Sequence, residues 1–188
     1  MIEVAKWSDI MNSRYGFLAR ALRAGLAFAA VAAGSAHAET VLNGTDRDFI
    51  RWDSQIERAQ QNMGEIAQRR GGSSSLREFG RRVQQDHAAA YFRLREIAGS
   101  LGEKRDEALD AIHLQVEQRF EAMPAGRFDV QFARHEVKDH RNFLEHFRAE
   151  VAGGTDRNLR DYASRQIPVL EEHLKEAEAL ASDAGQGQ

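Results

Sequence analysis

Four long stretches of the sequence repeat apolar side chains at alternating spacings of three and four residues. This spacing places the apolar side chains on one stripe of an α-helix. No stretch has the strict polar–apolar alternation that is typical of a half-buried β-strand. We therefore predict four amphipathic helices, over about residues 46–70, 75–100, 127–151 and 155–182.

The connections between these helices predict how they pack. Short glycine-containing connectors at 71–74 and 153–155 join the first two and the last two helices, and such connectors favour antiparallel neighbours. The longer middle connection carries a short helical pattern over 106–123, which Pro124 ends. The fold class is therefore all-α, a ferritin-like four-helix bundle with a short extra helix between the second and third long helices. The alternative is a five-helix array in which 106–123 is an equal member.

Two helix starts carry the spacing of a capping box. Thr45 with Asp48, and Ser75 with Glu78, place a hydroxyl three residues before a carboxylate. We expect the first two helices to begin at these residues.

Residues 11–38 have the three parts of a secretory signal peptide: an arginine-containing lead-in, an apolar run and a small-x-small cleavage site. The apolar run at 24–33 is too short to span a bilayer of about 30 Å. We expect cleavage after Ala38 and a periplasmic or secreted protein, with no transmembrane segment after signal removal. The sequence leaves open whether Met1 or Met11 is the start of translation.

The remaining chain predicts one bundle domain over 39–184, followed by a disordered tail over 185–188. Removing residues 1–38 takes away four basic and two acidic residues and leaves a net charge of −5. An acidic chain of mixed charge argues against nucleic acid as a partner. The complete absence of cysteine excludes thiol chemistry and disulfides.

His87 stands on the apolar stripe of the second helix, where the pattern calls for leucine or valine. His140 and His173 stand on or beside the stripes of the third and fourth helices. Bundles build metal sites from inward-facing side chains of opposed helices, and imidazole and carboxylate are common ligands. The predicted metal ligands are His87, His140, His173, Glu136 and Asp86, for zinc, iron, manganese or copper. The alternative is a structural histidine core whose nitrogens are satisfied by neighbouring acceptors.

Counting residues from the connectors predicts which histidines meet. His87 and His140 both fall near the middle of the bundle, which makes them the expected close pair. His173 is about seven residues out of level with His140 when both are counted from Gly153. Gln166 is then level with His140, and His173 lies apart unless a kink at Pro168 or a helix offset brings it in.

Familiar catalytic patterns are absent. The segment 135–140 resembles the zinc-protease motif His-Glu-x-x-His but has one residue too many, which turns the two histidines away from each other. The paired Glu-x-x-His motifs of di-iron bundles are also missing. We therefore do not expect an enzyme, although a metal-dependent oxidoreductase stays a third hypothesis.

Short motifs in a fixed order resemble an exported bacterial family. They are Asp46-Arg47-Asp48-Phe49, Leu76-Arg77-Glu78-Phe79, Gln85-Asp86-His87, Phe128-Asp129, Asp139-His140 and Ile167-Pro168-Val169-Leu170-Glu171-Glu172-His173-Leu174. Together they resemble the "domain of unknown function 4142" family. The resemblance implies a ferritin-like fold and export, and it implies no defined activity. The family's histidines correspond to His87, His140 and His173. Its typical Ala-Glu pair corresponds to Ala59-Gln60, and Glu57 lies one turn earlier, where it could substitute.

The function that these observations predict is an exported ferritin-like bundle of unassigned activity that binds a transition metal through inward-facing histidines. The alternative is a non-enzymatic envelope or stress-related interaction module. An envelope protein or a second copy of the chain is the expected kind of partner.

Overall fold

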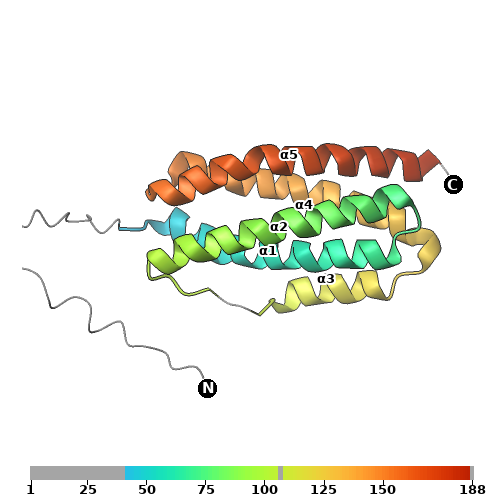
Figure 1. Ribbon diagram of the computed structural model, residues 1–188, viewed down its shortest axis with the longest axis horizontal. Helices are drawn as coiled ribbons and strands as arrows, with labels where there is room; N and C mark the ends of the chain where they lie inside the picture. The colour runs from blue at the N-terminus through green and yellow to red at the C-terminus, as the bar shows by residue number, and fades with distance from the viewer. Residues whose placement is uncertain (1–40, 106–107, 187–188) are drawn as a thin grey trace, which may run out of the picture. The chain divides into compact units, whose positions relative to one another are not determined.

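The computed structural model describes residues 41–105 and 108–186, and these residues form five helices and no strand. The helices are α1 (Gly44–Arg70), α2 (Ser74–Ser100), α3 (Ala111–Glu121), α4 (Ala125–Gly153) and α5 (Arg157–Gln186) (Figure 1). The expected signal peptide lies outside the described residues. Helix α5 extends to Gln186, two residues into the segment expected to be a tail.

The predicted all-α bundle is confirmed. The four long helices form two helical hairpins, α1–α2 and α4–α5, and the middle connection carries the short helix α3 (Figure 1). Helix α3 has only eleven residues and packs along α1, where Glu117 accepts a hydrogen bond from Asn62 at 2.9 Å. The five-helix array of equal members is therefore not what forms. No helix in the described ranges is long and apolar enough to cross a membrane.

A polar layer divides the core of the bundle into two apolar clusters. One cluster surrounds Phe49, Phe147 and Tyr162, and the other surrounds Phe79 and Phe132. On each of α2, α4 and α5, a buried histidine lies between the fully buried residues of one cluster and those of the other. Burying polar side chains costs free energy unless they have partners, so the hydrophobic effect does not account for this layer.

Both predicted capping boxes are wrong by two residues. Helix α1 is capped by Asn43, whose side chain accepts from the Asp46 backbone N–H at 2.9 Å while the Asp46 carboxylate accepts from the Asn43 N–H. Helix α2 is capped by Ser73. Tertiary contacts help to determine which residue caps each helix. Asp46, which forms the capping box with Asn43, also accepts a hydrogen bond from the Thr155 backbone N–H in the α4–α5 connector. Near α2, Asp129 of α4 accepts from the Ser73 backbone N–H at 2.8 Å.

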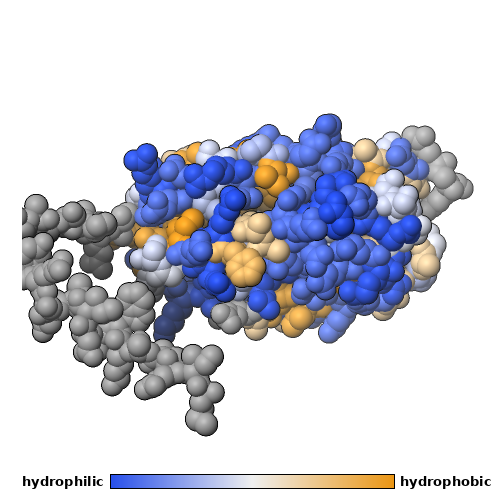
Figure 2. Space-filling model, viewed as in Figure 1, coloured by the Kyte–Doolittle hydropathy of each residue, from blue (hydrophilic) through white to orange (hydrophobic). Residues whose placement is uncertain are grey.

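The surface is mainly hydrophilic. Figure 2 shows one face on which hydrophobic residues are scattered between hydrophilic ones. The exposed large hydrophobic side chains among the described residues are spread along the chain: Val41, Phe92, Ile112, Leu114 and Val151. This distribution does not mark a particular docking surface.

Candidate metal centre

Three buried histidines from three helices meet in the polar layer. His87 of α2, His140 of α4 and His173 of α5 are 3%, 0% and 3% exposed. One ring nitrogen from each lies within 4.8 Å of those of the other two. The ring centroids are 5.9 Å apart for His87 and His140, 5.5 Å for His87 and His173, and 5.3 Å for His140 and His173.

The prediction that His173 lies apart is wrong, because its Nδ1 is 3.3 Å from Nε2 of His140. The α4–α5 connector is centred near Thr155 and not Gly153, so the two histidines are three residues out of level and not seven. Helical side chains also lean toward the N-terminus of their own helix. In antiparallel helices that lean brings His140 and His173 toward each other, so Gln166 is not the partner of His140.

The outward-facing nitrogen of each of these two rings has an acceptor. Nδ1 of His140 donates to the Glu136 backbone carbonyl at 2.9 Å, which leaves a lone pair on Nε2. Nε2 of His173 is 2.9 Å from the Asp86 carboxylate, which sits half-exposed at the edge of the bundle. When His173 donates to Asp86, its Nδ1 carries a lone pair that faces His140. In this tautomer two lone pairs face each other across 3.3 Å, whereas a proton on Nδ1 of His173 would make the same contact a hydrogen bond.

His87 follows the same pattern. Its Nδ1 lies 2.8 Å from Oε2 of Glu57 on α1, and its buried Nε2 has no hydrogen-bond partner. A buried ring nitrogen without a partner is costly unless something in the site binds it. When His87 donates to Glu57 and His173 to Asp86, the three ring nitrogens that carry lone pairs are His87 Nε2, His140 Nε2 and His173 Nδ1.

Burial keeps all three imidazoles neutral. It lowers the pKa of His87 to about 4 and holds that of His140 well below its usual value. Burial also lowers the pKa of His173, an effect that the neighbouring His87 increases and Asp86 opposes. Neutral imidazole is the form that binds metal ions.

A second group of polar side chains supports His87 from α1 and α5. The Tyr162 hydroxyl donates to Asp53 at 2.9 Å and lies 3.3 Å from Glu57. Burial raises the pKa of both carboxyls, and the charge of Glu57 raises that of Asp53 further. Asp53 is therefore the carboxyl that holds its proton more tightly, and Glu57, when ionised, is the acceptor for Nδ1 of His87.

Asp53 and Tyr162 are parts of the site that the sequence did not predict. The available signal was the spacing of Asp53 and Glu57, which are four residues apart and so share one side of α1 beside its apolar stripe. Glu57 does face the histidines, as expected of a substitute for the family's glutamate, but it contacts the outer nitrogen of His87.

The structure places the two predicted carboxylate ligands behind the histidines. Asp86 contacts the outer nitrogen of His173, and Glu136 has Oε2 3.5 Å from the outer nitrogen of His140. Burial, and to a lesser extent the charge of Asp139, hold the pKa of Glu136 well above its usual value, which favours the protonated carboxyl. Asp139, which is adjacent to His140 in sequence, instead lies 3.2 Å from His135.

The sequence matches the model of a protein family described as "Domain of unknown function (DUF4142)" over residues 31–180. The chain belongs to this family. It is also similar to a crystal structure of a DUF305 fragment from Deinococcus radiodurans, with a TM-score of 0.66 and 11% sequence identity. The match covers 75% of this chain and 97% of that fragment, and at this identity it speaks for the fold alone. No curated protein matches the chain.

Proposed function

We propose that this DUF4142 protein binds one transition-metal ion through His87, His140 and His173. The observation that carries the proposal is the convergence of three buried ring nitrogens, each on a ring whose other nitrogen contacts a carboxylate or carbonyl oxygen. Metal-binding histidines are commonly oriented in this way, because the outer acceptor sets the tautomer and the ring direction.

The distances suit a small ion. A tetrahedral ion with metal–nitrogen bonds of about 2.05 Å separates two ligand nitrogens by roughly 3.3 Å. His140 Nε2 and His173 Nδ1 are already 3.3 Å apart. At the upper limit of 4.8 Å, the His87 nitrogen has to approach by roughly 1.5 Å, which a rotation of its side chain provides.

The donor set favours zinc or copper over the other metals considered. Three neutral imidazoles suit late first-row ions, whereas manganese prefers oxygen ligands. The carboxyl groups near the site contact the outer nitrogens and do not supply a fourth ligand. A three-histidine tetrahedral site leaves one coordination position for water or a small anion.

A structural histidine core accounts less well for these contacts. It leaves His87 Nε2 buried without a partner and, while His173 donates to Asp86, it places two lone pairs 3.3 Å apart. Each of these features costs stability in a protein that holds no ion there.

Elemental analysis of the purified protein tests the proposal. We expect about one zinc or copper ion per chain, and loss of that ion in His87→Ala and His140→Ala. His146→Ala is the matched control, because His146 lies on the exposed part of α4 and stacks on Trp52. Glu57→Gln keeps the size of the side chain but weakens the acceptor, and we expect metal affinity to fall by about 10- to 100-fold.

A protein that purifies without metal and takes up neither zinc nor copper on titration would overturn the proposal. Equal loss of metal in the His146→Ala control would also contradict it. In either case the histidines would be structural, and the protein would be better explained as an interaction module.

We also propose that the protein acts outside the cytoplasm. The support is the signal-peptide pattern of residues 11–38 and the export implied by the family resemblance. N-terminal sequencing of the protein from the periplasmic fraction should begin at Glu39, and an intact N-terminus in a cytoplasmic fraction would contradict export.

A further inference from the structure

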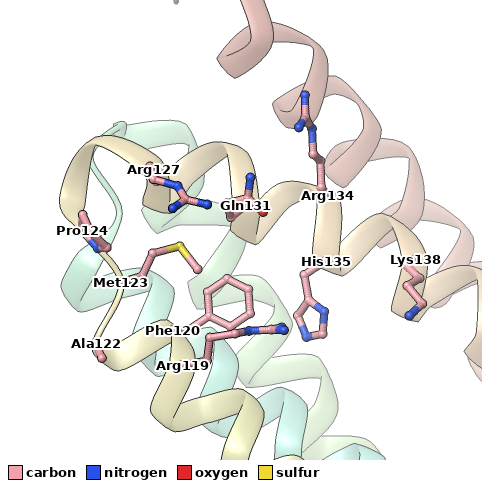
Figure 3. A pocket seen from close by; sticks show the side chains of 10 residues that line it. All are labelled: Arg119, Phe120, Ala122, Met123, Pro124, Arg127, Gln131, Arg134, His135 and Lys138. Atoms are coloured by element: carbon pink, nitrogen blue, oxygen red, sulfur yellow. The ribbon is translucent and has the colours of Figure 1, made fainter.

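An open groove lies where α3 ends and α4 begins, away from the three histidines. Its volume is about 580 Å³, within the range of small-ligand sites. The groove is lined by four exposed cations, Arg119 of α3 and Arg127, Arg134 and Lys138 of α4, and by no acidic residue. We call it the basic groove. Figure 3 shows Arg119 and Arg127 on either side of the Phe120 ring.

The four cations of the basic groove lack counter-charges. None of them forms an ion pair with a carboxylate of residues 41–105 or 108–186, although other arginines of α4 do. Arg141 pairs with Glu178 at 2.6 Å, and Arg148 pairs with Glu171 at 2.8 Å. Four unpaired cations around one hollow are unexpected in a chain whose net charge is −3, and their mutual repulsion disfavours the arrangement unless an anion offsets it.

An acidic side chain near the groove is already engaged by a histidine. Asp139 lies 3.2 Å from His135, which also lines the groove. Burial lowers the pKa of His135 to about 4, and the charges of Arg119 and Lys138 lower it further. The groove is therefore a region of positive potential in which His135 stays neutral.

The start of α4 adds to this positive potential. Pro124 precedes α4 and supplies no side-chain hydrogen bond to the first turn, whereas side chains cap α1, α2 and α3. Arg127 lies in that first turn, where a cation opposes the helix dipole and an anion is favoured. The missing side-chain cap and the position of Arg127 both lower the stability of the protein without a ligand, and a bound anion would offset both.

We propose that the basic groove binds a small ligand that carries two or more phosphate groups. Arginine side chains present paired N–H donors that match phosphate oxygens, and several cations spread around one groove suit several negative groups better than one. Met123 lines the groove and is partly exposed, so it offers apolar contact to the rest of the ligand, whereas the Phe120 ring is buried beneath Arg119. The same chemistry is offered by a free oligophosphate and by a phospholipid headgroup.

Calorimetric titration of the full chain with sodium tripolyphosphate tests the proposal. We expect saturable binding that weakens as salt is added, because the contacts are between exposed charges. The double variant Arg119→Gln/Arg127→Gln should weaken binding at least about tenfold, since each lost contact is a charge-assisted hydrogen bond. Arg93→Gln/Arg165→Gln is the matched control, because it removes two exposed arginines from α2 and α5. The control should bind within about twofold of wild type.

Two further measurements complete the test. Sedimentation with vesicles of cardiolipin, whose headgroup carries two phosphates, compared with phosphatidylcholine, distinguishes the source. Binding to the former that depends on Arg119 and Arg127 assigns a lipid headgroup, and binding of tripolyphosphate alone assigns a free ligand. His87→Ala should bind tripolyphosphate as wild type does, which separates this site from the metal centre. The proposal is overturned if wild type binds neither probe, or if the control loses as much binding as the groove variant.

Discussion

At the scale of single residues, the buried polar groups have different partners and therefore different consequences. The histidines of the metal centre contact an acceptor on one side and face one another on the other. Glu150, near the C-terminal end of α4, has both carboxylate oxygens buried without a hydrogen-bond partner. The arrangement of the histidines favours a bound cation, whereas burial of Glu150 without a partner favours the protonated form of its carboxyl.

Glu150 should make the stability of the bundle depend on pH. Burial raises its pKa from 4.5 to about 7; the charges of Asp46 and Asp156 raise it further, and that of Arg160 lowers it. The folded state therefore binds a proton more tightly than the unfolded state. The stability that Glu150 contributes through this proton is fully present below pH 4.5 and is lost as the pH rises toward 7. We expect Glu150→Gln to remove a decline of the order of 2 kcal/mol in the free energy of unfolding over this range.

Urea unfolding of wild type and Glu150→Gln at several pH values between 4.5 and 8 measures this difference. Glu145→Gln is the control, because Glu145 is exposed on the same helix. A variant profile that runs parallel to that of wild type at every pH would show that Glu150 does not titrate in this range.

At the scale of the helices, α1 and α2 approach each other closely through two glycines. A side-chain carbon added at Gly80 would lie 2.6 Å from Cβ of Ala67 and 2.8 Å from the backbone oxygen of Gly64. The reverse contact is equally tight, because a carbon at Gly64 would lie 2.5 Å from the backbone oxygen of Gly80. This close approach sets how α2 presents His87 to the other helices.

Gly80→Ala should therefore destabilise the protein by about 1–3 kcal/mol, because the two backbones must separate to admit the methyl group. Gly99→Ala on the same helix is the matched control, since an added carbon there meets nothing within 4 Å. The control should be neutral or more stable by up to about 1 kcal/mol, as alanine favours helix. Urea unfolding compares the two variants, and equal stability of both would contradict the close-packing argument.

At the scale of the whole molecule, the metal centre connects all four long helices. The three histidines come from α2, α4 and α5, and Glu57 of α1 contacts His87. An ion bound at this point favours the assembled bundle over the separated helices. Metal binding should consequently be measurable through global unfolding as well as at the site.

We expect zinc or copper at a free concentration of 100 times its dissociation constant to stabilise the fold by about 2.7 kcal/mol. For a domain of this size, this corresponds to a rise in Tm of roughly 5–10 °C. Thermal unfolding followed by circular dichroism, with metal and with a chelator, measures the shift. His87→Ala should show no shift, and magnesium should produce none in wild type. A wild-type Tm that is the same with metal and with chelator would contradict the prediction.

The sequence by itself determined the helices, because the repeat of a single helix sets the spacing of the apolar residues on its buried face. It also indicated His87, His140 and His173, since a histidine on an apolar stripe needs a partner. Tertiary structure decided which groups meet. Whether the side chains of His140 and His173 meet depends on where the α4–α5 connector turns and on the direction in which the side chains lean. The spacing of residues along one helix determines neither. Asn43 caps α1 because Asp46 is also held by the distant Thr155. The basic groove exists only because the chain turns at Pro124 and brings Arg119 of α3 beside α4.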